Sequence, residues 1–218
     1  MDIAIIAMTE NPLKVIWTAA RTCYSSQTPL ELWESEPSRE EMLRLVKKIF
    51  LSKHLSVVEH ASVTFAVSGV SRTLLAQYTR HRIGVSMSVQ SQRYVSERSA
   101  KNGGLFQHVI PPSIVENPEA QAIYEEQCRK IQDCYDTLLD LGVPKEDARF
   151  ILPGGADTNF VTTLNFRSLL DIYTKRVLVP GAQWEIKEMV SKMVELVVEA
   201  EPWLGEIIEA MTEGETGG

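Results

Sequence analysis

Long apolar runs are absent from this 218-residue chain. No stretch reaches the roughly 18 apolar residues that a membrane-spanning helix requires. The chain begins Met1-Asp2-Ile3, without the basic segment that opens a secretory signal. We therefore expect a cytoplasmic protein with no membrane partner.

Cysteine is scarce, and its pattern argues against two further classes. The chain has three cysteines, Cys23, Cys128 and Cys134. An odd count without a Cys-x-x-Cys pair disfavours a disulfide framework and a thiolate zinc site, so we expect these residues to be small and buried. His54, Glu59 and His60 offer no zinc spacing, because adjacent residues of an extended segment point to opposite faces. We expect no metal site.

Glycine motifs that cradle phosphates are missing as well. The chain contains neither the P-loop pattern nor the Gly-x-Gly-x-x-Gly of a dinucleotide-binding fold. A nucleotide would therefore have to be held mainly by side chains.

Acidic residues are missing from one long segment, residues 60–96. At the chain's frequency of 29 acids in 218 residues, roughly five would be expected there. The segment carries four arginines, Arg72, Arg80, Arg82 and Arg93, in a protein whose net charge is −7. Such a local cationic segment fits a small anion better than a polyanion. We expect its guanidinium groups to converge without neighbouring carboxylates.

The apolar periodicity that is present predicts both strands and helices. Strands are expected at 3–7, 62–68 and 158–164, with Gly69 ending the second. Helices are expected from Asn11-Pro12 and over about 39–51, 71–79, 117–140, 165–175 and 182–200, with loops at 25–37 and 96–113. No repeat or linker divides the chain. We expect one α+β domain over residues 1–218, with a frayed tail at 213–218.

The most distinctive motif is Arg80-His81-Arg82. Basic residues are favoured at a helix C-terminus by the helix dipole, so a purely structural role is one interpretation. The motif continues, however, into the acid-free Ser91-Gln92-Arg93, which offers many hydrogen-bond donors to a phosphate or a pyrimidine edge.

These residues resemble the signature of the flavin-dependent thymidylate synthases of the ThyX type, written Arg-His-Arg, seven or eight residues, then Ser. Here eight residues, 83–90, precede Ser91. The resemblance extends over about residues 3–205 and includes His54 and the segments 19–24, 59–60, 142–144, 148–149, 152–153, 164–165, 167–169 and 182–186.

The resemblance implies a central, mostly antiparallel sheet flanked by helices, in a homotetramer with active sites shared between subunits. It implies an enzyme that converts dUMP to dTMP, with methylenetetrahydrofolate as one-carbon donor and NADPH as reductant acting through FAD. The partners would be small molecules, with no nucleic acid and no membrane.

By the same resemblance, one group of residues binds dUMP. They are Gln77, Tyr78, Thr79, Arg80, Val89, Gln90, Ser91, Gln92, Arg93, Arg149 and Arg176. Arg176 is also the expected catalytic residue, since it matches the arginine thought to favour ionisation at N3 of the uracil. A permanently charged guanidinium suits that role because it stabilises an anion without itself titrating. Its alternative role is to satisfy carbonyls at a helix C-terminus.

A second group is expected to contact FAD. They are Ser56, Glu59, Arg80, His81, Arg82, Ile83, Val89, Asn165, Phe166, Arg167 and Asp171. His54 matches a histidine beside the folate and the flavin ring, although a capping or core histidine is an equal alternative. Asp171 is unfavourable near a diphosphate and would have to face ribose or adenine.

Three alternatives remain open. A nucleic-acid-binding module could use the basic stretch 72–93, but it would favour more aromatic residues there and a basic protein overall. A related flavoprotein without synthase activity would share the motifs. Cys23 could act as a nucleophile, but no neighbouring His or Lys lowers its pKa, and we expect it to pack in the core or a wall.

Overall fold

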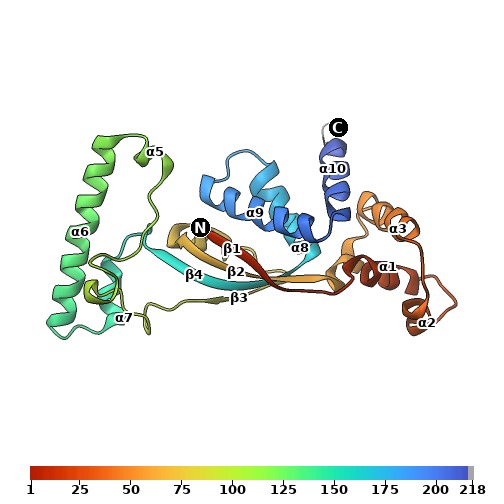
Figure 1. Ribbon diagram of the computed structural model, residues 1–218, viewed down its shortest axis with the longest axis horizontal. Coiled ribbons are helices and arrows are strands. Elements are labelled where there is room, and N and C mark those ends of the chain that lie inside the picture. The colour runs from red at the N-terminus through yellow and green to blue at the C-terminus, as the bar shows by residue number, and fades with distance from the viewer. Residues whose placement is uncertain (216–218) are drawn as a thin grey trace. The chain divides into compact units, whose positions relative to one another are not determined.

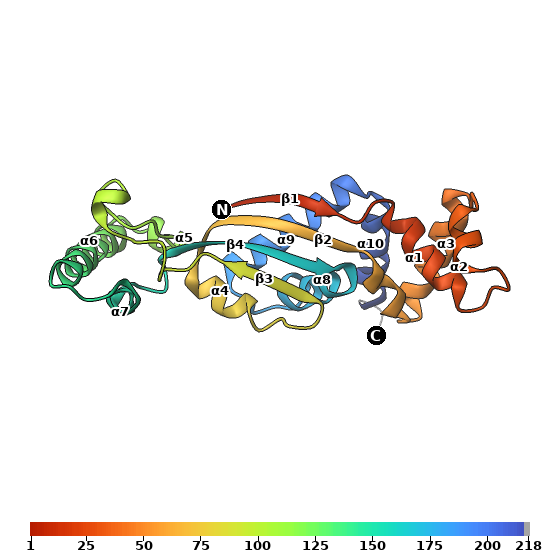
Figure 2. The same cartoon turned by 90° about the horizontal axis from the view of Figure 1, so that it is seen from below.

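The computed structural model describes residues 1–215, and side chains up to residue 210. Four strands form one sheet in the order β1-β2-β4-β3 (Figures 1 and 2). The strands are β1 Asp2–Met8, β2 Ser62–Ser71, β3 Val85–Val89 and β4 Asp157–Asn165. The contacts within the chain group its residues into two compact units, described separately below.

The α-helices are α1 Pro12–Thr22, α2 Pro29–Glu34, α3 Arg39–Leu51, α4 Arg72–Tyr78, α5 Pro112–Val115, α6 Pro118–Asp140, α7 Lys145–Ala148, α8 Phe166–Tyr173, α9 Trp184–Ala200 and α10 Trp203–Glu215. Three short 3-10 helices are η1 Leu55–His60, η2 Ser99–Lys101 and η3 Arg149–Ile151, and η4 Thr174–Leu178 is a π-helical turn.

The sheet is antiparallel, as hydrogen bonds between its neighbouring strands show. Between β2 and β4, the hydroxyls of Thr64 and Thr163 are hydrogen-bonded, and the amide of Gly69 donates to Asn159 Oδ1. The amide of Thr9, just after β1, bonds to the carbonyl of Ser62 at the start of β2. The amide of Gln90, just after β3, bonds to Asn159 near the start of β4, while the amide of Asn165 at the end of β4 bonds to Gly84 just before β3. The expected α+β fold with an antiparallel central sheet is confirmed.

Unit 2 comprises Ile3–Ala66, His81–Met87 and Val161–Gly218. Alternate residues of its strand segments, including Val63, Phe65 and Leu164, are buried. Helices α8 and α9 lie on one face of the sheet (Figure 2). Trp203, at the start of α10, is also buried and stacks on Phe166. Unit 2 also contains the start of β3 and the end of β4, beside which the resemblance places flavin contacts.

Unit 1 comprises Met1–Asp2, Val67–Arg80 and Ser88–Phe160. Its own small core is Phe106, Cys128 and Ala156, packed against α6 and against Leu105 and Leu152. Asn117 caps α6 by accepting hydrogen bonds from the amides of residues 119 and 120. The helix ends before Gly142, whose positive φ of 84° is readily adopted by glycine.

Three local expectations were wrong. The expected loop 25–37 contains α2, because Thr28 and Glu31 form a reciprocal capping box that starts a helix at Pro29. Gly69 does not end β2, which runs through it at a φ of 67° to Ser71. Of the cysteines expected to be buried, only Cys128 is, whereas Cys23 and Cys134 are exposed.

The C-terminal region contains one more helix than the sequence predicted. Pro202 is followed by another helix, α10, which continues through the start of the expected tail to Glu215. The rest of that tail, residues 216–218, lies outside the described residues. Among residues 1–215, no helix combines the length and the apolar character needed to span a bilayer.

Candidate active site

The Arg-His-Arg motif is anchored to the helices of unit 2 through His81. The side chain of Arg176 donates a hydrogen bond from Nε to Nε2 of His81 at 3.0 Å. Arg176 lies in η4, the π-helical turn that follows α8, and such turns recur at functional sites. The structure thus joins the expected catalytic arginine to the signature motif, 95 residues away in sequence.

The backbone after His81 is fixed by the N-terminus of α8. The Ser168 hydroxyl donates to the carbonyl of Ile83 at 2.8 Å, and the Asn165 side chain caps α8 by accepting from the amide of Ser168 at 2.8 Å. Gly84 fits between them at a φ of 64°, and an added Cβ there would lie 2.4 Å from both Asn165 Nδ2 and Ser168 Oγ. Only glycine fits this close approach.

A cavity of about 510 Å³ opens beside α1, α3 and η1 of unit 2. His54, Ser56 and Arg167, all expected to contact flavin or folate, line it, and Lys53 adds a further cation. None of the described residues that line it is acidic. The remaining lining residues are Ala20, Cys23, Tyr24, Leu45, Ile49, Leu55 and Val57. Cationic donors facing an apolar wall suit an anionic, ring-containing ligand.

Buried donors without acceptors lie on the helix that supplies part of this wall. Among the described residues, Trp17 Nε1 and Arg21 Nε of α1 are buried without a hydrogen-bond partner. The Arg21 guanidinium also lies over the ring of Tyr24, at 5.2 Å from its centroid. Unsatisfied buried donors carry a free-energy cost that an acceptor-rich ligand would relieve.

Other expected flavin residues of unit 2 have different environments. Glu59 forms an ion pair with Arg167, so one carboxylate does lie beside a cation of the site. Asp171 pairs with Lys175 at 2.7 Å on an exposed helix face. Phe166 is fully buried in the core, while Arg82 and Ile83 are exposed.

In unit 1, five of the expected dUMP residues lie on one short segment. The side-chain oxygen of Gln90 accepts a hydrogen bond from Asn159 Nδ2 at 2.8 Å, and Ser91 Oγ accepts from the amide of Arg93 at 3.2 Å. Gln92 is buried, at 6% exposure, and Val89 ends β3. Residues 89–93 are therefore held by the neighbouring strand and by their own turn.

Arg149 is brought close to this segment through Glu146. Arg93 Nε lies 3.4 Å from a carboxylate oxygen of Glu146, whose backbone carbonyl accepts a hydrogen bond from Arg149 Nε at 3.1 Å. Residues 93 and 149 thus meet at the same turn, although they are distant in sequence.

The remaining expected dUMP residues of unit 1 lie at the end of α4. Tyr78 is fully buried and stacks on Phe160 with ring centroids 5.5 Å apart. The Thr79 hydroxyl bonds to the carbonyl of Ala76, and the amide of Arg80 to the carbonyl of Gln77. Tyr78, whose ring packs in the core, thus lies between Gln77 and the exposed Arg80. The contacts of residues 77–80 with dUMP stay predictions.

The expectation that the arginines converge without neighbouring carboxylates was wrong. Acidic residues from other parts of the chain lie near the arginines of this segment. Arg93 forms an ion pair with Glu146, and the charges of Glu97 and Asp157 act on Arg72. Absence of acids in a local segment says nothing about the acids that tertiary folding brings to it.

Arg72 is the residue of this region that sequence reasoning did not assign to a ligand. Its Nη2 donates to the carbonyl of Gln90 at 3.3 Å, while its Nε is buried without a partner among the described residues. Burial lowers the pKa of Arg72, and the nearby Arg149 lowers it further. Its position in the acid-free segment 60–96 is the sequence feature that could have identified it as a candidate ligand-binding residue.

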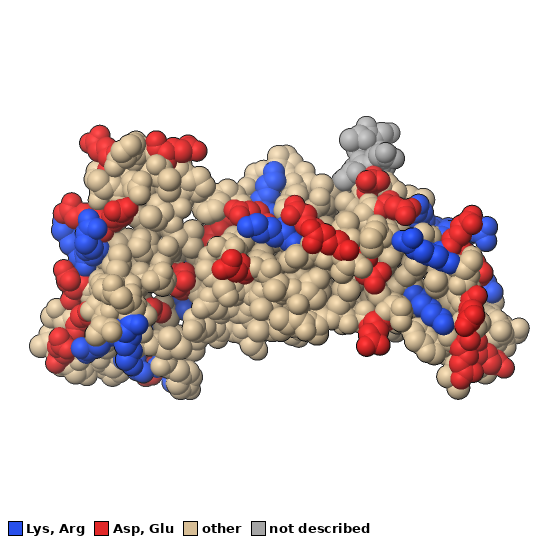
Figure 3. Space-filling model, in the orientation of Figure 1, with Lys and Arg blue, Asp and Glu red and all other residues tan. Residues whose placement is uncertain are grey.

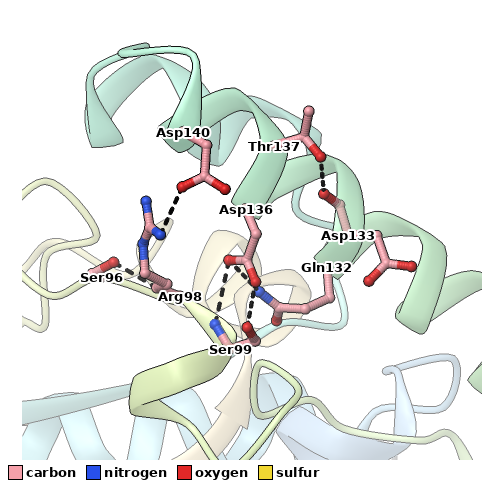
Figure 4. A network of polar contacts seen from close by, with 8 residues as sticks. All are labelled: Ser96, Arg98, Ser99, Gln132, Asp133, Asp136, Thr137 and Asp140. Atoms are coloured by element: carbon pink, nitrogen blue, oxygen red, sulfur yellow. Dashed lines mark hydrogen bonds and ion pairs between the residues drawn. The ribbon is translucent and has the colours of Figure 1, made fainter.

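Burial raises the pKa of Glu97 and the pKa of Asp157. The loop that carries Glu97 is fastened to α6 by a polar network (Figure 4). Asp136 accepts hydrogen bonds from the amide and hydroxyl of Ser99 and from Gln132 Nε2, which also bonds to the carbonyl of Glu97. Arg98 adds an ion pair to Asp140 at 2.9 Å. Glu97 therefore has a fixed position.

No metal-binding cluster of His, Cys, Asp or Glu occurs among the residues that the structure describes.

Known proteins are similar to this chain. The family model of the thymidylate synthase complementing protein matches residues 4–203. A flavin-dependent thymidylate synthase of Geobacter sulfurreducens is 40% identical over 197 residues, covering 90% of this chain and 82% of that protein. The chain belongs to the flavin-dependent thymidylate synthase family.

Further similarities extend over most of the chain. A flavin-dependent thymidylate synthase of Halobacterium salinarum is 33% identical and covers 96% of each chain. The UMP/dUMP methylase PolB of Streptomyces cacaoi, bound with 5-Br dUMP, has a TM-score of 0.78 at 22% identity, covering 96% of this chain and 94% of that one.

Thymidylate synthase X of Helicobacter pylori, with FAD and dUMP, has a TM-score of 0.71 at 23% identity, covering 90% of this chain and 93% of that one. These two likenesses confirm the expected family fold. The family match spans both units and every residue that the resemblance assigned to a ligand, which lie between residues 54 and 176.

Proposed function

We propose that the protein is a flavin-dependent thymidylate synthase, which methylates dUMP reductively to dTMP. The one-carbon donor is methylenetetrahydrofolate, and NADPH is the reductant, acting through FAD. Family membership supports this activity. The observation on this chain that carries it is the bond between Arg176 and His81, which attaches the proposed ionising arginine to the signature motif.

The chemistry requires negative charge on the uracil, because C5 of a neutral uracil is a poor nucleophile. Arg176 would stabilise that charge, since its guanidinium stays protonated and its geometry is fixed before substrate arrives. While Arg176 donates to Nε2 of His81, the imidazole is neutral and carries its proton on Nδ1. This contact uses Nε of Arg176, and we propose that its terminal guanidinium nitrogens donate to uracil.

The phosphate of dUMP would be bound by Arg80, Arg93 and Arg149, with Ser91 and the backbone of its turn. Arg93 must exchange its exposed contact with Glu146 for the phosphate, which a weak surface ion pair permits. We add Arg72 to this set for two reasons. Its buried Nε lacks a hydrogen-bond partner among the described residues, and its charge interacts with the charge of Arg149.

The residues present fit FAD. Lys53, Ser56 and Arg167 offer donors for a diphosphate, and the same cavity presents apolar and aromatic side chains to a ring system. We propose that His54 borders the ring and that His81, Arg82 and Ile83, held by Ser168 and Asn165, contact it from the anchored loop. FAD would supply electrons that no side chain can supply.

We further propose a homotetramer whose active sites are shared between subunits. Three large apolar side chains are strongly exposed, Ile83 at 89%, Tyr94 at 78% and Phe150 at 82%. Each directly follows a proposed site residue in sequence, Arg82, Arg93 and Arg149. If a ligand or a second copy of the chain covered these side chains, the removal of their apolar surface from water would stabilise the complex. We propose a cytoplasmic location and no nucleic-acid or membrane partner.

The proposal is tested on the purified protein loaded with FAD. We expect a yellow protein whose flavin is bleached by NADPH in a dUMP-dependent manner and which forms dTMP, identified by mass, once methylenetetrahydrofolate is added. A flavoprotein that is reduced but never forms dTMP would indicate the related flavoprotein instead. Protein that cannot be loaded with FAD would contradict the proposal outright.

A further inference from the structure

A second, larger cavity of about 1010 Å³ lies between α3 and α10 in unit 2. We call it the α3–α10 groove and define it by its basic residues, Arg39, Arg44, Lys47 and Lys48. Apolar side chains of Leu43 and Leu51 also line it. Figure 3 shows blue side chains gathered over this end of unit 2, with red ones among them. Nothing in the synthase chemistry above uses this groove.

The charges of the groove are not balanced. Among its described side chains, four cations face two acids, Glu40 and Glu206. Glu206 is already engaged, because Lys47 forms an ion pair with it at 2.5 Å and lowers its pKa, with a smaller contribution from Arg39. An excess of positive charge therefore remains, in a protein whose net charge is −7.

Arg44 and Lys48 carry two of these positive charges. Both are exposed, and neither has an ion-pair partner among the side chains that the structure describes. They lie four residues apart on α3, a spacing at which like charges repel and weaken a helix. An anion bound across both would remove that repulsion, so the groove is complementary to a ligand with several negative charges.

The groove adjoins the cavity proposed for flavin and folate at the C-terminal end of α3. Ser52 lines the groove, and the next two residues, Lys53 and His54, line the cavity. Leu45 and Ile49 of the same helix line the cavity as well. A flexible ligand leaving the cavity beside His54 would therefore have to cross only the end of this one helix to reach the groove.

Lys53 occupies an unusual backbone position at that crossing. Its φ of 58° places it in the left-handed region, where helices prefer glycine directly after their last turn. A lysine there keeps a cation at the junction at some conformational cost. Together with Lys48 and Arg44, it extends a line of positive charge from the cavity into the groove.

We infer that the α3–α10 groove binds the γ-linked glutamate tail of the folate co-substrate. The inference rests on the proposed function, which places the folate rings beside His54. Each added glutamate of such a tail contributes one carboxylate on a flexible chain, and Lys53, Lys48 and Arg44 present cations in that order. The groove would thus increase the affinity for polyglutamylated folate without taking part in the methyl transfer.

The test compares tetrahydrofolate monoglutamate with its triglutamate, each titrated calorimetrically into FAD-loaded protein saturated with dUMP. We expect the triglutamate to bind about five- to tenfold more tightly to the wild type, the gain of two exposed ion pairs. The preference should shrink when salt is raised from about 50 to about 300 mM, because exposed charges are screened. In the double variant Arg44→Gln/Lys48→Gln it should fall to about one.

Lys187→Gln provides the control, since Lys187 is an exposed lysine of α9 and the substitution changes charge by the same amount per site. It should keep the preference for the triglutamate. Methylenetetrahydrofolate monoglutamate should support equal turnover by the double variant and the wild type, because the groove does not touch the reacting atoms.

The contrary outcomes are distinct. Equal affinity of the wild type for both folates, or a preference that survives the double substitution, would overturn the inference and leave the proposed function intact. A double variant that keeps the preference but has a raised KM for NADPH would assign the groove to a nicotinamide phosphate and also overturn it. Failure of both folates to bind would contradict the proposed function itself, and this inference with it.

Discussion

The side chains of Arg176 and His81 are joined by a hydrogen bond of 3.0 Å between Arg176 Nε and His81 Nε2. The bond connects a π-helical turn after α8 to the loop that carries the Arg-His-Arg motif. Because an arginine can only donate, His81 has to accept with Nε2 and is neutral in this contact. One imidazole therefore helps to fix the direction in which the guanidinium of Arg176 points.

Gly84 provides a sharp test of how the motif loop is anchored. Gly84→Ala should destabilise the fold by about 1–3 kcal/mol, since a Cβ would lie 2.4 Å from Asn165 Nδ2 and Ser168 Oγ at a φ of 64°. Gly142→Ala is the control, because Gly142 also has a positive φ but an added Cβ would meet nothing within 4 Å. It should cost only about 1 kcal/mol by urea denaturation. Equal losses for both variants would show that the close approach at Gly84 is unimportant.

Ser168 holds the loop by a single side-chain bond to the carbonyl of Ile83. Ser168→Ala removes that bond and should weaken FAD binding about fivefold, the effect of one hydrogen bond worth about 1 kcal/mol. Flavin fluorescence titration measures the change. Ser191→Ala, on α9, should leave the affinity unchanged. An unaltered FAD affinity in Ser168→Ala would show that the anchoring of this loop does not contribute to flavin binding.

Arg80 is expected to bind the phosphate of dUMP. Arg80→Ala should raise the Kd of dUMP about 10- to 100-fold, because a charged hydrogen bond contributes roughly 1.5–3 kcal/mol. Equilibrium dialysis with FAD-loaded protein measures this. The exposed Arg129 of α6 offers a control variant, Arg129→Ala, that loses the same charge. If both variants bound dUMP equally well, Arg80 would have no place in the substrate site.

The half-buried Glu97 predicts a pH dependence of stability. Burial raises its pKa in the folded state, so the folded protein binds the proton more tightly than the unfolded chain does. Stability should therefore fall as pH rises from the ordinary pKa of a glutamate, about 4.3, through the raised value. Glu97→Gln should flatten that fall and increase the urea midpoint at pH 7. The same substitution at the exposed Glu116 should change neither, and a steeper fall in Glu97→Gln would contradict this account.

Much of the fold could be predicted because its signals are local. Asn117 and Asn165 were identifiable as helix caps from the residues that follow them, and both accept the expected backbone hydrogen bonds. The capping box of Thr28 and Glu31 was equally local, but it lay in a polar, proline-containing stretch that resembled a loop. Its pattern was sufficient to predict α2.

The electrostatics of the site could not be predicted in the same way. The acids that approach the arginines, Glu97, Glu146 and Asp157, are distant in sequence and reach them only through folding. The bond between His81 and Arg176 likewise depends on the π-helical turn, for which the sequence carries no periodic signal. Segment composition predicted where the site lies, whereas tertiary contacts determine the charge of that region.

The central claim is that Arg176 stabilises negative charge on a uracil bound beside FAD. Its most direct test is single-turnover formation of dTMP, quantified by mass spectrometry, in wild type and Arg176→Ala, both loaded with FAD to the same extent. We predict that the variant keeps its flavin and loses dTMP formation by about 10²- to 10³-fold. Wild-type turnover in Arg176→Ala would contradict the claim.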